Sequence, residues 1–172
     1  GSIRFANNVG SLIDAAKRLQ DLENVKILIY GNGDDRPMLE KRCKDEGISN
    51  VVFKQNWIDP KYVPYVLSKS YVNVLNYMPG QFGTYGGSQS KMFQYMASGH
   101  PICCNLEMMY CPIQKNIIGI AKVFSDADEY AGAIRRLLTM PKDEYEAMCQ
   151  RARKTAEAFD YQALTNKLVE LF

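Results

Sequence analysis

Two patterns of apolar residues alternate along this chain. Short runs rich in valine and isoleucine predict buried strands at residues 25–30, 50–54, 71–77, 102–105 and 121–124. Apolar residues three and four positions apart predict helices at residues 9–21, 36–46, 61–69, 89–98, 126–138, 142–159 and 161–171. Residues 106–119 are less regular, and we expect a loop with one helical segment there.

This alternation of strands and helices predicts an α/β fold. We expect a Rossmann-like, doubly wound parallel sheet with extra C-terminal helices. The strands are apolar throughout, which indicates burial on both faces. Ligands of such sheets bind at the carboxyl ends of the strands, so the loops 31–35, 55–60 and 77–90 are expected to line a site.

Local signals mark the helix ends. Side chains that accept hydrogen bonds precede four helices and are expected to cap them: Asn7 or Asn8, Asp34 or Asp35, Ser88 or Ser90, and Ser125 or Asp126. Gly99 is expected to end the helix 89–98 with a positive φ.

The most informative stretch runs from residue 84 to residue 105. Gly86 and Gly87 allow a ligand to approach the backbone closely because glycine has no Cβ. The helix that follows begins with free N–H groups, which favour a phosphate or carboxylate. Lys91 in its first turn opposes the helix dipole and is explained if an anion binds there. The alternative is an ordinary connection with an exposed lysine.

Composition narrows the functional classes. The chain has 172 residues, of which 47% are hydrophobic and 23% charged, as in a soluble globular domain with a substantial core. A net charge of +2 gives no support for a nucleic-acid surface. We find no apolar run long enough to span a bilayer and no signal peptide. The first residue is not methionine, which suggests a fragment.

Cysteine and histidine usage argues against metal and disulfide sites. Five cysteines without C-x-x-C spacing predict neither a disulfide framework nor a zinc site, and they indicate a reducing, cytoplasmic environment. The single histidine, His100, precedes Pro101 and is interpreted as a turn residue rather than as part of a Ser-His-Asp triad.

Residues 88–102 (Ser-Gln-Ser-Lys-Met-Phe-Gln-Tyr-Met-Ala-Ser-Gly-His-Pro-Ile) resemble the signature of family 4 glycosyltransferases of the GT-B fold. In the bacterial polysaccharide branch the signature reads roughly S-P-N-K-L-F-E-Y-M-A-x-G-K-P-I. Residues 7–17 are similar to the first helix of the family's C-terminal domain, residues 27–33 to its "iiGdG" strand and turn, and residues 159–161 to its "fdw". The resemblance extends over nearly the whole chain.

The resemblance implies that residues 1–172 form a single nucleotide-sugar-binding domain, the C-terminal half of a retaining glycosyltransferase of capsule or polysaccharide biosynthesis. The substrates would be a nucleotide-diphosphate sugar and a lipid-linked or oligosaccharide acceptor, with no metal cofactor and no nucleic acid. The acceptor would bind the missing N-terminal domain, so the fragment alone is expected to be inactive. The enzyme would be cytoplasmic, at the inner face of the membrane, with peripheral membrane contact in the full protein.

The resemblance also implies roles for individual residues. The donor diphosphate would contact Arg4, Gly87, Ser88, Ser90 and Lys91, and the ribose would contact Gln94. The nucleobase would lie by the loop of Trp57 and Ile58, and the sugar would lie near Tyr85 and Gly86. No catalytic residue is assigned.

Two positions depart from the family pattern. Gln94 stands where most members carry an acidic residue, and an amide lacks the strength of a charged hydrogen-bond acceptor. Gly86 stands where many members carry a second acidic residue.

Several alternatives stay open on the sequence. The chain is also compatible with a nucleotide-binding module without catalysis, a GT-B nucleotide-sugar epimerase-like domain or a receiver-like domain. For Trp57 we expect packing beneath its loop in preference to stacking on a base. Residues 108–110 (Met-Met-Tyr) are expected in the core, the alternative being contact with the missing domain.

Overall fold

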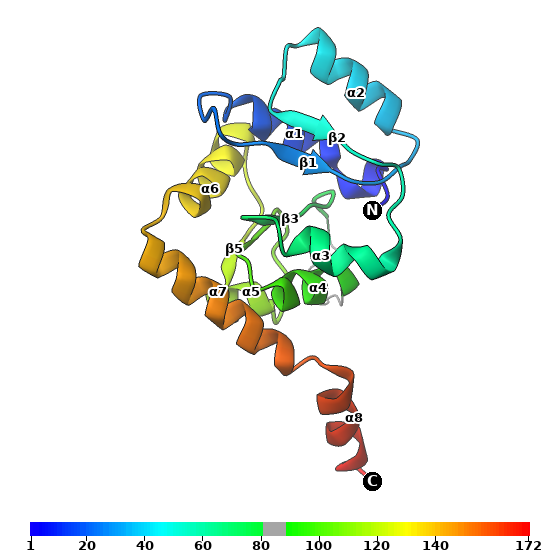
Figure 1. Cartoon of the computed structure of the whole chain (residues 1–172), viewed down its shortest axis with the longest axis vertical. Helices are drawn as coiled ribbons and strands as arrows, with labels where there is room; N and C mark the ends of the chain where they lie inside the picture. Colours follow the sequence, from blue (N-terminus) through cyan, green and yellow to red (C-terminus); the bar gives the residue numbers. More distant parts are fainter. Residues whose placement is uncertain (81–88) are drawn as a thin grey trace.

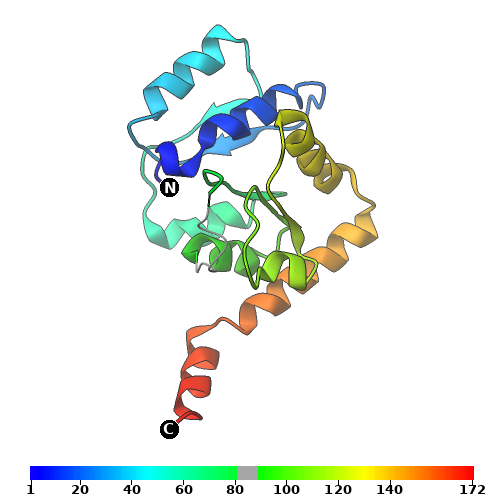
Figure 2. The ribbon, with the colours of Figure 1, turned by 180° about the vertical axis from the view of Figure 1, so that it is seen from behind.

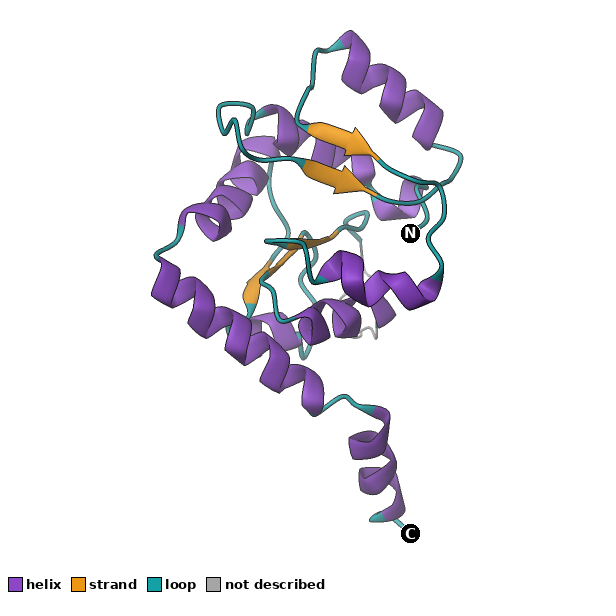
Figure 3. Ribbon diagram, viewed as in Figure 1, coloured by secondary structure: helices purple, strands orange, loops and turns teal. Residues whose placement is uncertain are grey.

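The computed structural model describes residues 1–80 and 89–172. Within these residues, five parallel strands lie in two small sheets (Figures 1 and 3). In one, β1 (Ile27–Ile29) pairs with β2 (Val51–Phe53). In the other, β4 (Ile102–Cys104) lies between β3 (Asn73–Leu75) and β5 (Gly119–Ala121). The predicted α/β class with parallel strands is confirmed, although the strands are shorter than predicted.

Burial on both faces holds for the centre of the larger sheet only. All three residues of β4 are fully buried. In β1, by contrast, Leu28 is 50% exposed, so this strand has one covered face. The expectation of two-sided burial was therefore wrong for the smaller sheet.

Residues 1–3 run beside the end of β1. Ser2 forms a parallel bridge with Asn32, and the Ile3 amide donates a 2.8 Å hydrogen bond to the Asn32 carbonyl oxygen. Gly33 has a φ of +158°, and a Cβ there would lie 2.1 Å from the Ile3 carbonyl oxygen. Glycine is thus required at this turn because two backbone segments touch.

The helices connect the strands and cover the sheets. Between β1 and β5 lie α2 (Arg36–Asp45), the 3₁₀ helix η2 (Pro60–Tyr62), α3 (Val63–Leu67), α4 (Ser90–Ser98) and α5 (Pro112–Lys115). The 3₁₀ helix η1 (Phe5–Asn7) and α1 (Val9–Lys17) precede β1, and α6 (Ala127–Thr139), α7 (Lys142–Glu157) and α8 (Tyr161–Val169) end the chain. Helix α4 packs along α7, and α1 packs on α6.

The predicted caps have mixed outcomes. Asp126 caps α6, because its Oδ1 accepts a 2.8 Å hydrogen bond from the Glu129 amide. Gly99 ends α4 with a φ of +73°, as predicted. The capping predictions for Asn8 and Asp35 were wrong, since neither side chain bonds its helix, and Ser90 is the first helical residue rather than the cap.

The C-terminal helix α8 projects from the rest of the molecule (Figures 1 and 2). Its N-terminus is capped by Asp160, yet it has no buried residue. Among the described residues, no helix is both long enough and apolar enough to cross a bilayer.

Candidate functional site

Lys91 occupies the first turn of α4, on the side of the larger sheet where the strands end. Its ammonium group lies over residue 1, because a Cβ at Gly1 would be 3.0 Å from Lys91 Nζ. Burial lowers the pKa of Lys91. In the described part of the chain Lys91 forms no ion pair. A half-buried cation without a carboxylate favours an anionic ligand.

The start of α4 presents further polar groups to the same place. Gln89 precedes the helix with an extended backbone, and its side chain does not cap the first N–H groups of α4; its carbonyl oxygen accepts a 2.9 Å hydrogen bond from the Met92 amide. Gln94 is exposed and stands three positions after Lys91, which places both side chains on one face of the helix. Ser90 is exposed at the helix start. The arrangement supplies hydrogen-bond donors and one positive charge.

Four residues of the predicted site, Tyr85, Gly86, Gly87 and Ser88, lie outside the described residues. Arg4 is described and exposed. It directly follows residues 1–3 and precedes η1, whereas Lys91 lies against Gly1 at the other end of this short segment.

Trp57 is 72% exposed, so the expectation that it packs beneath its loop was wrong. Arg36 lies close to the end of β2, with its guanidinium 5.5 Å from the centre of the Phe53 ring. Arg36 also donates hydrogen bonds to the carbonyl oxygens of Gly31 and Lys54, which follow β1 and β2. Ile58, next to Trp57, is half-buried. Trp57 is therefore available to a ligand or partner.

Residues 108–110 divide between the two expected environments. Met108 is buried in the core cluster of the larger sheet, whereas Met109 and Tyr110 are exposed. The core interpretation was wrong for the last two.

Sequence reasoning missed two asparagines, one at the end of β3 and one at the end of β4. Asn105 is buried, and its amide forms two hydrogen bonds with the backbone of Tyr77: Oδ1 accepts from the N–H at 2.7 Å, and Nδ2 donates to the C=O at 2.8 Å. The Tyr77 hydroxyl in turn donates a 2.7 Å hydrogen bond to Gln89 Oε1. Asn76 is the other. The available signal was a polar residue directly after an apolar strand run.

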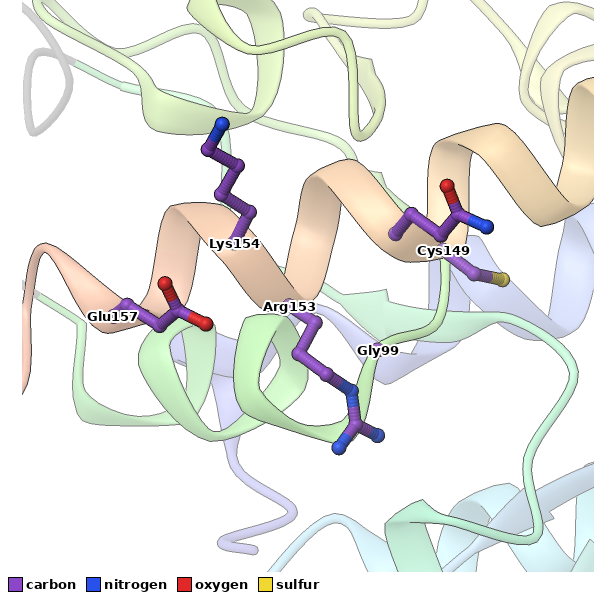
Figure 4. Close-up of a pocket in the computed structure, with 6 residues that line it drawn as sticks. Gly99, Cys149, Arg153, Lys154 and Glu157 are labelled. Carbon is purple, nitrogen blue, oxygen red and sulfur yellow. The ribbon is translucent and has the colours of Figure 1, made fainter.

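A hollow of about 430 Å³ lies at the opposite end of α4, against α7 (Figure 4). Arg153 and Lys154 both line it, but their side chains point to opposite sides of α7. Arg153 donates a 3.4 Å hydrogen bond to the Ser98 carbonyl oxygen, where a cation stabilises the negative end of a helix. This hollow is accounted for by helix packing.

A second hollow, of about 230 Å³, lies between the starts of α1 and α6 beside the ends of β3 and β4. Its lining includes Asn8, Asn105 and Tyr130. The polar groups of these three residues already form hydrogen bonds with other parts of the described chain, so none of the three needs a ligand as a partner.

His100 acts in packing. Its ring nitrogens lie 3.2 Å from the Tyr145 hydroxyl and 3.3 Å from the Ser68 carbonyl oxygen, which agrees with a turn residue. In the described part of the chain, no three histidine, cysteine or acidic side chains form a cluster suited to a metal ion.

Comparison with protein families identifies the domain. Residues 1–155 match the family model described as "Glycosyl transferases group 1". The chain belongs to this family. No curated protein matches its sequence significantly.

Solved structures resemble this group 1 domain in fold. Anabaena HepE in complex with UDP aligns with a TM-score of 0.80 and 14% identity, covering 99% of this chain and 46% of that chain. A TarM variant from S. aureus, in a complex that includes UDP, aligns with a TM-score of 0.78 and 19% identity, covering 99% of this chain and 34% of that chain. The chain thus spans between a third and a half of the length of these two proteins.

A third structure is a domain by itself. The C-terminal domain of the Francisella tularensis glycosyl transferase group 1 family protein LpcC aligns with a TM-score of 0.73 and 16% identity, covering 92% of this chain and 82% of that one. At such identities the likeness establishes the fold alone. The fold of the group 1 domain is the Rossmann-like one of GT-B glycosyltransferases.

Proposed function

We propose that this domain binds the nucleotide-diphosphate sugar of a glycosyltransferase. The observation that carries the proposal is Lys91, a half-buried cation with no carboxylate partner among the described residues, in the first turn of α4. Membership of the group 1 family supports a sugar nucleotide as the anion. The diphosphate would contact Arg4, Ser90 and Lys91, together with Gly87 and Ser88.

The rest of the donor would extend from this diphosphate. Gln94 follows Lys91 on the same helix face and would contact the ribose through its amide. The base would lie by the loop of Trp57 and Ile58, where the exposed indole offers a surface for stacking. The sugar would lie near Tyr85 and Gly86.

The chemistry of this half would be electrostatic. When a glycosidic bond to a nucleotide diphosphate breaks, negative charge accumulates on the departing phosphate. Preorganised N–H groups and the Lys91 ammonium would stabilise that charge in the transition state, without a metal ion. The sugar would pass, with retention, to a hydroxyl of a lipid-linked or oligosaccharide acceptor in cell-surface polysaccharide synthesis, as in family 4.

The domain arrangement is part of the proposal. The chain would be the C-terminal half of a cytoplasmic enzyme at the inner face of the membrane, and an N-terminal domain would bind the acceptor. The coverage of HepE and TarM supports this arrangement, because the matched region is less than half of each.

The test is calorimetric titration of the domain with UDP, GDP, ADP and CDP. UDP comes first because it is present in the HepE and TarM structures. We expect one diphosphate to bind saturably, and Lys91→Ala to weaken it at least about tenfold, which corresponds to about 1.4 kcal/mol. Lys26→Ala is the matched control, since this exposed lysine precedes β1 at the opposite end of the strands. The proposal fails if folded wild-type protein binds none of the four.

A further inference from the structure

The end of β3 is held by a side chain where backbone pairing stops. Strands β3 and β4 pair up to Leu75 and Cys104. One further backbone hydrogen bond, 3.3 Å from the Asn105 amide to the Leu75 carbonyl oxygen, closes the ladder. Beyond this bond, the side-chain amide of Asn105 takes the place of a neighbouring strand. It bonds both the N–H and the C=O of the Tyr77 backbone. The Asn105 side chain therefore fixes where the chain leaves the sheet.

Tyr77 links the end of β3 to the start of α4. Its hydroxyl bonds Gln89, the residue directly before the helix. Lys91 is two residues further on, in the first helical turn. A path from the Asn105 side chain through the backbone and hydroxyl of Tyr77 to the Gln89 side chain thus joins the buried end of β4 to the helical turn that contains the Lys91 ammonium group.

Asn76 forms a second path, in the opposite direction. Its Nδ2 donates to the carbonyl oxygens of Asn7, at 2.7 Å, and Asn8, and the Met78 amide donates a 3.0 Å hydrogen bond to the Ala6 carbonyl oxygen. These bonds tie the end of β3 to η1, which begins directly after Arg4. The hydroxyl of the buried Tyr130 donates a hydrogen bond to Asn76 Oδ1 and so helps to fix the Asn76 amide.

The geometry points to Asn105 and Asn76 as positioning residues of the donor site. We infer that Asn105 sets the place of Lys91 through Tyr77 and Gln89, while Asn76 sets the place of the Arg4 turn. The two paths pass through the adjacent residues Tyr77 and Asn76 at the end of β3, so they fix the spacing of the two cations that would hold the diphosphate. This inference rests on the proposed donor site and adds that its geometry is set by amides that do not touch the ligand.

The test measures the affinity of the nucleoside diphosphate that binds the wild-type domain best. Asn105→Ala is expected to weaken binding about tenfold. Tyr77→Phe is the milder variant: it keeps the ring and removes the hydroxyl, and we expect a loss of about threefold. The matched control is Asn50→Ala, because Asn50 is equally buried and donates a 2.7 Å hydrogen bond to the Ala16 carbonyl oxygen, but it precedes β2 at the opposite end of the strands. The Asn50→Ala variant should have a lower melting temperature than the wild type and the same affinity for the nucleoside diphosphate.

A double-mutant cycle separates positioning from general stability. If Asn105 acts through Lys91, the loss caused by Asn105→Ala should shrink to within about twofold when Lys91 is already alanine. Tyr77→Phe should behave in the same way. A purely structural role would lower the melting temperature and leave this coupling at zero.

The outcomes distinguish the two proposals. Absence of binding by the wild-type domain overturns the donor site and with it the positioning role. Binding by the wild type that is unchanged in Asn105→Ala and Tyr77→Phe, or losses that simply add to that of Lys91→Ala, overturns only the positioning role.

Discussion

The Tyr130 hydroxyl donates a 2.8 Å hydrogen bond to Oδ1 of Asn76, joining helix α6 to the end of β3. Tyr130 is buried and stacks on Phe124 with ring centres 4.5 Å apart. The Tyr130 side chain thus lies in the core, and its hydroxyl bonds the side-chain amide of Asn76. That amide in turn ties the end of β3 to the residues before α1. The hydrogen bond between Tyr130 and Asn76 therefore helps to hold the end of β3 against η1, beside the proposed site.

Removing this hydroxyl should destabilise the domain. Tyr130→Phe leaves the ring in place and deprives a partly buried amide oxygen of its donor, so we expect a loss of about 1–2 kcal/mol in the free energy of unfolding. Urea denaturation measures it. Tyr161→Phe, at a tyrosine that is 90% exposed, is the control and should unfold as the wild type does. Equal stability of Tyr130→Phe and wild type would contradict the importance of this bond.

Acid sensitivity should depend on Glu129. Hydrogen bonds from Lys122 and from the Ser125 amide lower the pKa of this carboxyl group from 4.5 to about 2. Above pH 4.5 the carboxylate is ionised in both states, and its stabilisation is fully present. As the pH falls from 4.5 to 2, Glu129 becomes protonated in the unfolded chain but stays ionised in the folded chain, so the free energy of unfolding decreases.

Glu129→Gln should flatten that part of the stability profile. The measurement is the urea midpoint of wild type and variant between pH 5 and pH 2. Glu23→Gln, a change at an exposed turn residue, is the control. If the profiles of wild type and Glu129→Gln stay parallel over this range, the lowered pKa has no bearing on stability.

Two glycines should respond in opposite ways to alanine. Gly99 has a φ of +73°, and a Cβ there would meet the Arg153 guanidinium at 3.1 Å, so Gly99→Ala should cost about 1 kcal/mol. Gly132 lies inside α6 with nothing within 4 Å of an added Cβ, so Gly132→Ala should stabilise by about 0.5–1 kcal/mol. Thermal unfolding of both variants checks the contrast, and a shift in the same direction for both would contradict it.

The thiols should react in a set order. Cys43, Cys103, Cys104 and Cys111 are buried, and burial raises the pKa of Cys104 to about 12. Cys149 is half-buried on α7. In the folded domain a thiol reagent should therefore modify Cys149 first and the other four only as fast as the protein unfolds. Rapid modification of Cys103 or Cys104 would show that the centre of the larger sheet opens.

The features that local sequence signals predict are those that depend on near neighbours. The apolar run of β4, the positive φ of Gly99 and the cap at Asp126 are of this kind. The caps expected at Asn8 and Asp35 failed, and Asn8 shows why: its amide points instead to the Tyr77 carbonyl oxygen, 69 residues away, at 3.4 Å. A side chain with two possible partners is assigned by the tertiary structure.

The candidate site divides in the same way. Lys91 was predicted from its place in the first turn of a helix that follows glycines, and the structure shows it half-buried in that turn, while its contact with a ligand stays a prediction. Asn105 was not predicted, because its partner depends on which strand ends adjoin, and spacing along the chain does not contain that information. The exposure of Trp57 was also missed, because the burial of a loop side chain depends on which other elements pack against it.

The central claim is that a diphosphate binds at Lys91, and the most direct measurement compares a nucleoside diphosphate with its nucleoside. Both are titrated calorimetrically into wild type and Lys91→Ala, with the nucleotide that binds best. We predict that Lys91→Ala weakens the diphosphate at least about tenfold and leaves the nucleoside within about twofold, because the lysine meets only the phosphates. Equal losses for both ligands, or no loss for the diphosphate, would contradict the account.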